Sequence, residues 1–210
     1  MTLTQKVQEA ELVQSRYIRC EYRKGASLQD WYVQDSLKQL SRVPVRIQRL
    51  MAEGCARIVF FNGPLTDNPE MGNLRGKALF GAQGYTWDSL AGGYSSGTDT
   101  AFIGVNGKYI GDRDIALLHE LGHLFDFIIG KHVFHRALSE SVKVHNAASV
   151  EPFPNPYLNQ PEEFVAAAFE LYYGGIEKRR ELLLRHPIIH NFLSDIEREI
   201  LAVGVQRDMR

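Results

Sequence analysis

The segment from residue 115 to residue 130 constrains the fold of this chain more than any other, because it is long and mostly apolar and closes with Gly130. Its length and composition predict a largely buried helix that ends at Gly130. Residues four apart lie on the same face of a helix, so His119 and His123 point in one direction. The helix therefore offers two imidazole nitrogens to one metal ion.

The pentapeptide from His119 to His123 has the form His-Glu-x-x-His, which is typical of zinc hydrolases. In that chemistry the zinc lowers the pKa of a bound water, and Glu120 takes the proton from it. Two core histidines beside a buried or capping glutamate are the alternative interpretation. A glutamate buried without a partner is costly, and Gly122 costs the helix about 1 kcal/mol relative to alanine, which indicates close packing there. We therefore predict one zinc ion per chain.

A zinc site with two histidines from one helix needs a third protein ligand. Residues 161–173 are predicted to form a helix, because they begin with a proline and are followed by two glycines. Glu162 and Glu163 lie in its first turn, where acidic residues also favour a helix N-terminus by charge alone. Glu163 leads directly into the apolar face that starts at Phe164, so we prefer it to Glu162 as the third ligand.

Residues 131–150 carry three further histidines, His132, His135 and His145. A third histidine six residues after His123 would indicate a metzincin, but that position is Ile129. We therefore predict that the three histidines lie on the surface or in loops.

Composition narrows the classes of function. The net charge is -1 and there is no basic tract, so nothing predicts a nucleic-acid partner. Cys20 and Cys55 make no disulfide framework. The first ten residues lack the apolar core of a classical signal peptide, and no run reaches the ~18–20 apolar residues of a membrane span. We expect a monomeric protein that is cytoplasmic, or an effector that is exported by a non-classical route.

The remaining pattern predicts an α+β protein. β-Branched and aromatic residues predict strands at 56–61 and 100–105, and the Gly-rich stretch 62–98 predicts ordered loops and short strands near the active site. The other expected helices span residues 4–24, 28–43, 45–53, 176–186 and 188–203. Smaller expected features are a helix N-cap at Ser27, a turn at 106–107, a short strand at 108–110, a helix cap at Asp112 or Asp114, an extended loop at 152–161 and a frayed tail at 204–210.

Two segments together resemble the anthrax lethal factor-like metallopeptidases. They are His-Glu-Leu-Gly-His-Leu-Phe-Asp at 119–126 and Pro-Glu-Glu-Phe-Val-Ala-Ala-Ala-Phe at 161–169. This group includes the Pro-Pro endopeptidases, and the Mlc titration factor A peptidases are related to it. Residues 75–76, 85–93 and 101–104 also resemble the segment that precedes the zinc helix in this family. The resemblance covers about residues 56–185.

The resemblance implies a zincin-like fold of the gluzincin type. We expect a helical N-terminal layer over residues 1–54 and a zinc metallopeptidase domain over residues 55–210, in one continuous globular unit. The domain would hold a small mixed sheet with an edge strand beside the active-site helix, followed by C-terminal helices.

The resemblance further implies a zinc endopeptidase in which the two histidines and Glu163 hold the metal and Glu120 is the general base. In the family a tyrosine seven residues before the ligand glutamate donates a hydrogen bond to the oxyanion. Here that position is Pro156, and Tyr157 stands six residues before Glu163. Either the loop shifts by one residue and Tyr157 serves, or the donor is absent; we favour Tyr157.

A second departure from the family is Ala167, which stands where lethal factor-type members carry a glutamate that braces a zinc-binding histidine. Asp126 lies on the same helix face as His119 and His123, and we expect it to take over this role. Ligating imidazoles normally donate their other N–H to a carboxylate or a carbonyl. A solvent-facing or capping aspartate is the alternative.

A protein or peptide substrate is expected to lie extended along the strand at 100–105, paired to its edge at Phe102, Ile103 and Gly104. Trp87 either lines a specificity pocket or packs in the protein interior. The alternative function is a zinc-stabilised binding or regulatory protein with little turnover. A secreted toxin or effector protease would differ from this enzyme in biology and not in chemistry.

Overall fold

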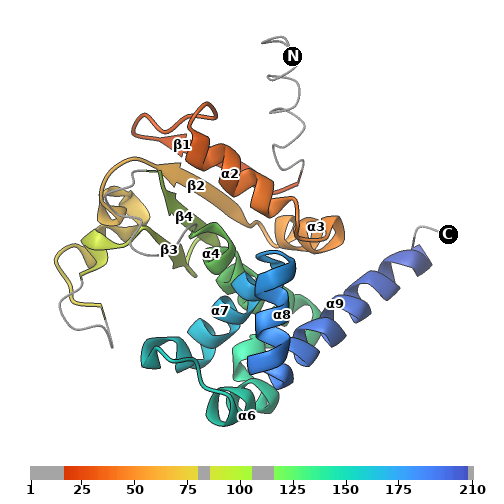
Figure 1. The fold of residues 1–210 in the computed structure, drawn as a ribbon. Helices are drawn as coiled ribbons and strands as arrows, with labels where there is room; N and C mark the ends of the chain where they lie inside the picture. Colours follow the sequence, from red (N-terminus) through yellow and green to blue (C-terminus); the bar gives the residue numbers. More distant parts are fainter. Residues whose placement is uncertain (1–16, 80–85, 106–115, 208–210) are drawn as a thin grey trace.

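The structure is a computed structural model, and it describes residues 17–79, 86–105 and 116–207, with side chains up to residue 202. A four-stranded sheet lies at one side of the molecule, and the helices pack against it and against one another (Figure 1). The turn at 106–107, the strand at 108–110 and the cap at Asp112 or Asp114 fall outside the described residues, as does the first part of the helix expected at 4–24.

The sheet is mixed, with the strand order β1-β2-β4-β3. Its strands are β1 (Arg19–Arg23), β2 (Arg57–Phe61), β3 (Gly92–Ser95) and β4 (Thr100–Gly104). The first two strands and β4 run parallel, and β3 runs antiparallel to β4. The strands expected at 56–61 and 100–105 are confirmed, and with them the α+β class and the small mixed sheet.

The predicted place of the edge strand is wrong. β4 pairs with β2 on one side and with β3 on the other, so its backbone groups are already used within the sheet. Within the part of the chain that the structure describes, the strand that ends the sheet beside the active-site helix is β3. Two of its four residues are glycines, which have a low strand propensity, so propensity alone does not predict this strand.

The helix expected over residues 4–24 is wrong where the structure describes it, because Arg19–Arg23 is a strand. Apolar and charged residues alternate along it: Cys20 and Tyr22 pack against the core, whereas Glu21 and Arg23 form an ion pair at 3.1 Å. That period of two is the signature of a strand. The helical N-terminal layer therefore contributes one strand to the common sheet.

The N-terminal helices are α2 (Trp31–Leu40) and α3 (Val45–Glu53). The N-cap of α2 lies three residues after the predicted cap at Ser27. Asp30 is at the N-cap position, and its carboxylate accepts a hydrogen bond from the backbone N–H of Ser27 at 2.7 Å, which closes the turn before the helix.

The active-site helix is α4 (Leu117–Leu124), as predicted, but it does not end at Gly130. It continues through a π-helical turn (Phe125–Ile129) into α5 (Gly130–Phe134), and His135 then ends it in a left-handed conformation with φ 59°. A Cβ atom on Gly130 would lie 2.5 Å from the carbonyl oxygen of Arg136. Gly130 therefore permits the returning chain to pass close by, and is not a helix terminator.

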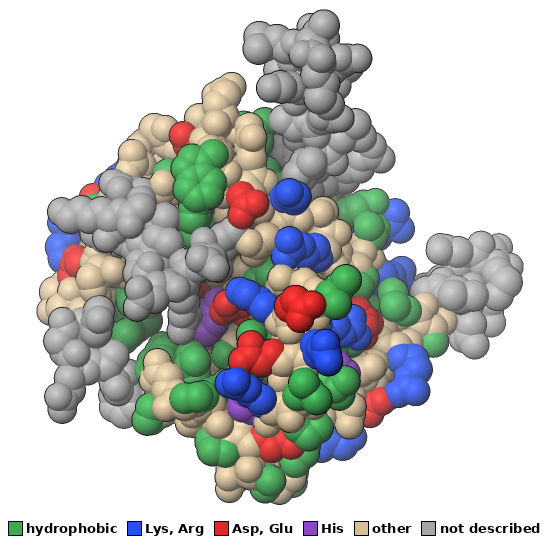
Figure 2. Space-filling view, viewed as in Figure 1, with side chains coloured by type: hydrophobic (Ala, Val, Ile, Leu, Met, Phe, Trp, Pro, Cys, Tyr) green, Lys and Arg blue, Asp and Glu red, His purple; other side chains and the backbone are tan. Residues whose placement is uncertain are grey.

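The C-terminal half is helical. Its helices are α6 (Val142–Val150), α7 (Pro161–Tyr173), α8 (Ile176–Arg185) and α9 (Pro187–Arg207). The bounds of α7 and α8 agree with prediction, and α9 extends into the expected tail. Charged side chains gather over α8 in the foreground of Figure 2, because residues 177–181 at its start are all charged and such a run favours a solvated face.

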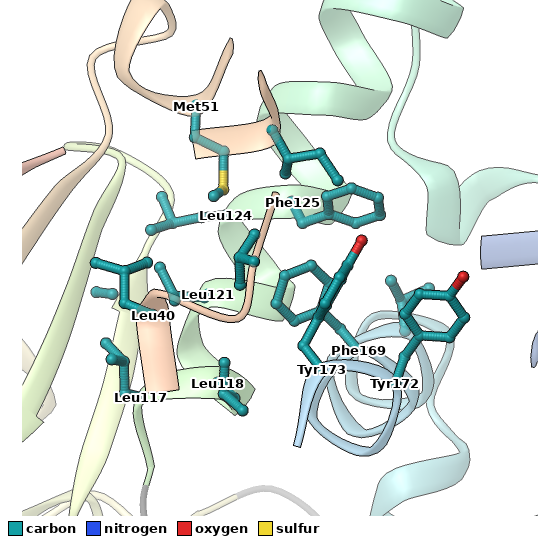
Figure 3. Packing of buried hydrophobic residues seen from close by; sticks show 14 of the residues in the cluster. Leu40, Met51, Leu117, Leu118, Leu121, Leu124, Phe125, Phe169, Tyr172 and Tyr173 are labelled. Carbon is teal, nitrogen blue, oxygen red and sulfur yellow. The ribbon is translucent and has the colours of Figure 1, made fainter. Parts of the chain in front are cut away.

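One hydrophobic cluster runs through the described residues from Ile18 to Ile200. α4 lies in its middle. Figure 3 shows Leu121 and Leu124 between Leu40 and Met51 on one side and α7 on the other. Within the described residues, no helix is both long and apolar enough to span a membrane.

Candidate metal centre

Two imidazoles and one carboxylate converge between α4 and α7. Nε2 of His119 lies 3.1 Å from Oε2 of Glu163, and Nε2 of His123 lies 3.7 Å from Oε1 of the same carboxylate. One donor atom from each of the three residues lies within 4.8 Å of the others. Two histidines and one carboxylate are a donor set of catalytic zinc sites. The donor set and its convergence therefore fit a zinc ion.

This convergence depends on a close crossing of two helices. A Cβ atom on Gly122 would lie 2.6 Å from Cα and 2.9 Å from the carbonyl oxygen of Ala166. The close packing predicted at Gly122 is thus confirmed, and it is α7 that packs there. With the two backbones in contact, the first turn of α7 carries Glu163 to the imidazoles of α4.

The carboxylate of Glu163 is held in its charged form. Burial raises its pKa, but the hydrogen bond from His119 and the positive charge that His119 and His123 can carry outweigh burial, and the pKa is lowered to about 2. A metal ligand must be deprotonated, so Glu163 is in the form that binds a cation near neutral pH. Glu162, the alternative ligand, is exposed to solvent.

Tyr157 also reaches this centre. Its hydroxyl donates a hydrogen bond to Oε1 of Glu163 at 2.6 Å. The backbone of the loop is held by Asn155, whose side chain accepts from the N–H of Tyr157 at the start of a short 3-10 helix (Pro156–Asn159). The shift of one residue relative to the family pattern therefore does not take the hydroxyl away from the site.

Glu120 is buried between α4 and the edge strand β3. A Cβ atom on Gly92 would lie 3.0 Å from Oε1 of Glu120. The missing side chain at Gly92 thus leaves the space in which the carboxylate lies. This places the predicted general base beside the edge strand.

Tyr94, two residues further along β3, points to the same side as Gly92. Its ring stacks on the imidazole of His123, with centroids 5.8 Å apart and planes 10° apart. Its hydroxyl donates to Asp99 at 3.1 Å, and burial together with the charge of Asp99 raises its pKa. The hydroxyl therefore stays protonated, and the ring limits the rotation of His123. Tyr94 belongs to the Gly-rich stretch 62–98, which was expected from the sequence to lie near the active site.

The predicted role of Asp126 is corrected. Its Oδ1 accepts a hydrogen bond from the backbone N–H of Ser139 at 2.7 Å, so it caps the segment that follows α5. The carboxylate that lies beside Nδ1 of His119, the ring nitrogen that faces away from Glu163, is that of Glu170, whose Oε2 is 3.7 Å from it. Glu170 is a lone charge in the otherwise uncharged stretch from Phe164 to Tyr173, and that was the sequence signal for it.

The residues predicted to bind the substrate do not lie at an edge of the sheet beside the metal centre. Phe102, Ile103 and Gly104 are buried in the interior strand β4, so they offer no free edge. Trp87 packs against the small cluster around Phe61, on the sheet face opposite α4, which favours the packing interpretation.

The three histidines of residues 131–150 are exposed, as predicted, and none of them belongs to the group of candidate metal ligands in the described chain. They are His132, His135 and His145.

The known proteins that this chain matches belong to the same group that its sequence motifs resemble. The family described as "Anthrax toxin lethal factor, N- and C-terminal domain" matches residues 26–196. A Pro-Pro endopeptidase of Clostridioides difficile strain 630 is 27% identical over 164 residues, which cover 76% of this chain and 73% of that protein. A Pro-Pro endopeptidase of Paenibacillus alvei is 26% identical over 164 residues, with 76% and 74% covered. The structure of the Pro-Pro endopeptidase PPEP-2 from Paenibacillus alvei superposes with a TM-score of 0.68 at 20% identity, covering 88% of this chain and 99% of that one, and so shares the fold.

Proposed function

The chain belongs to the anthrax toxin lethal factor family and is a metalloendopeptidase, and we propose that it uses one zinc ion held by His119, His123 and Glu163. The observation that carries this proposal is the convergence of one donor atom from each of these residues within 4.8 Å. Bound there, a zinc ion would supply Lewis acidity, which lowers the pKa of a water and polarises the scissile carbonyl group.

The residues of the chain supply the proton transfers. Glu120, one residue from His119 and buried beside β3, takes the proton of the attacking water and passes it to the leaving amine. The hydroxyl of Tyr157, already at the site, donates a hydrogen bond to the oxyanion of the tetrahedral intermediate.

The substrate is proposed to lie extended along the free edge of β3, and not along β4. Among the described strands β3 ends the sheet, so its N–H and C=O groups on the side away from β4 can pair with a peptide backbone. Gly92 and Tyr94 on this strand flank Glu120 and His123, so a paired peptide would run past the proposed base and the metal ligands.

The test compares the wild-type protein with Glu120→Ala on a peptide library that includes Pro-Pro sequences, since the curated relatives are named for that bond. We expect both proteins to bind one zinc ion and only the wild type to cleave. Removal of zinc with a chelator should abolish cleavage, and added zinc should restore it. Zinc binding without any cleavage by the wild type would instead favour a binding protein.

A matched pair of variants tests the ligand assignment. Glu163→Ala should lose zinc, whereas Glu162→Ala, a change to the exposed neighbour in the same helical turn, should keep it. If Glu162→Ala loses the metal and Glu163→Ala keeps it, the assignment of the third ligand is wrong.

A further inference from the structure

Glu170 lies on α7, two helical turns after Glu163, so both carboxylates project from the same face of the helix. The residues between them have no charge. Glu163 meets Nε2 of His119 at 3.1 Å, and Glu170 lies 3.7 Å from Nδ1 of the same ring. The imidazole of His119 therefore lies between two carboxylates of one helix, with the contact at Nδ1 at an ion-pair distance that is longer than a hydrogen bond.

The two oxygens of Glu170 have different neighbours. Oε2 faces His119, and Oε1 lies 3.6 Å from Nζ of Lys178 on α8. The Glu170 side chain is 19% exposed, and the His119 side chain is 4% exposed. A charged carboxylate in this position needs a partner for each oxygen, and the lysine provides the second one.

We propose that Glu170 is a positioning residue of the metal centre, which fixes His119 through Nδ1 and is itself held by Lys178. A carboxylate only accepts hydrogen bonds, so Glu170 favours the tautomer with the proton on Nδ1. In that tautomer the lone pair of Nε2 lies on the side of the ring where Glu163 lies, and it is available to a metal ion in place of the proton that Nε2 shares with Glu163. This role deepens the proposed function and rests on it, since it concerns the affinity of the same zinc site.

The experiment measures the dissociation constant of zinc by competition with a chromogenic chelator, for the wild type, Glu170→Gln and Glu170→Met. Partners of this kind typically account for about 10- to 100-fold in metal affinity. We expect Glu170→Met to bind zinc at least about tenfold more weakly than the wild type. Glu170→Gln should lie between the two, because its amide oxygen is an acceptor facing Nδ1 but carries no charge. Glu162→Gln is the control, since it makes the same chemical change at an exposed position of the same helix, and its affinity should equal that of the wild type.

The unfolding temperature of the zinc-free proteins separates positioning from a role in the fold. We expect it to be nearly the same for all four proteins. Equal zinc affinity of the wild type and Glu170→Met would overturn the proposal, and so would a loss of affinity that merely follows a lower unfolding temperature. A wild-type protein that binds no zinc would overturn the proposed function as well, whereas zinc binding that is lost in Glu163→Ala and unaffected in Glu170→Met would refute only the role of Glu170.

Discussion

Substitution of Gly122 by alanine tests whether the crossing of α4 and α7 sets the geometry of the metal centre. The added Cβ would lie 2.6 Å from Cα of Ala166 and 2.9 Å from its carbonyl oxygen, whereas ordinary contacts of a Cβ are 3.4–4 Å. Both neighbours are backbone atoms and cannot rotate away. The two helices must therefore separate by roughly 1 Å, which is the kind of backbone shift that overpacking produces.

Two energies of opposite sign follow. Overpacking costs about 1–3 kcal/mol, and replacement of glycine inside a helix returns about 1 kcal/mol. We expect the variant to be less stable by up to about 2 kcal/mol, which lowers the unfolding temperature by about 2–4 °C per kcal/mol in a chain of this size. The effect on zinc should be greater, because Glu163 is three residues from the crossing and metal–ligand distances tolerate only about 0.2 Å. Zinc affinity should fall at least about tenfold.

The assay is chelator competition for zinc together with thermal unfolding of the zinc-free protein. Gly97→Ala is the matched control, because a Cβ there would meet no atom within 4 Å. If Gly122→Ala binds zinc as tightly as the wild type and unfolds at the same or a higher temperature, the crossing does not determine the site, and the reasoning is refuted.

Three further changes have defined outcomes. Gly92→Ala should displace the Glu120 carboxylate, which lies 3.0 Å from the new Cβ, and we expect peptide turnover to fall by about tenfold or more with zinc content unchanged. Tyr157→Phe should lower kcat by about 10²- to 10³-fold and leave zinc bound; retention of full turnover would exclude it as the oxyanion donor. Burial raises the pKa of Asp126 from 3.8 to about 6, so its stabilising contribution is complete below pH 3.8 and is lost as the pH rises through 6. Asp126→Asn keeps an acceptor for the Ser139 N–H without the charge. In urea unfolding of the zinc-free proteins, the free energy of unfolding of the variant should therefore exceed that of the wild type by up to roughly 3 kcal/mol at pH 7–8, and the difference should shrink below pH 4. A difference that does not change with pH would contradict this.

Local patterns predicted the parts of the site that one segment determines. The proline before Glu162 and the glycines after Tyr173 are short-range signals, and the structure has α7 with these bounds. The spacing of His119 and His123 needs only the geometry of a helix, and α4 provides it. The first turn of α7 then brings Glu163 to both rings.

Features that depend on distant segments were not predictable in the same way. β1 is short, and its period of two was hidden by charged residues that also suit a surface helix. The free edge of the sheet depends on the pairing of β3 with β4, which no local pattern determines. Asp126 and Glu170 are both flanked by apolar residues in the sequence, and only the packing of α7 on α4 decides which of them approaches His119.

The glycine pair at the start of β3 restricts how cleavage preference can be altered. Gly92 faces the proposed base, and a Cβ on Gly93, on the opposite side, would lie 2.7 Å from the side chain of Leu65. A side chain at Gly92 would displace Glu120, and one at Gly93 would displace Leu65 on the other face of the sheet. Neither position can therefore be substituted to change the substrate preference without disturbing its neighbour. Engineering of this strand is therefore confined to its second half, where Ser95 is partly exposed and makes no contact with the metal ligands among the described interactions.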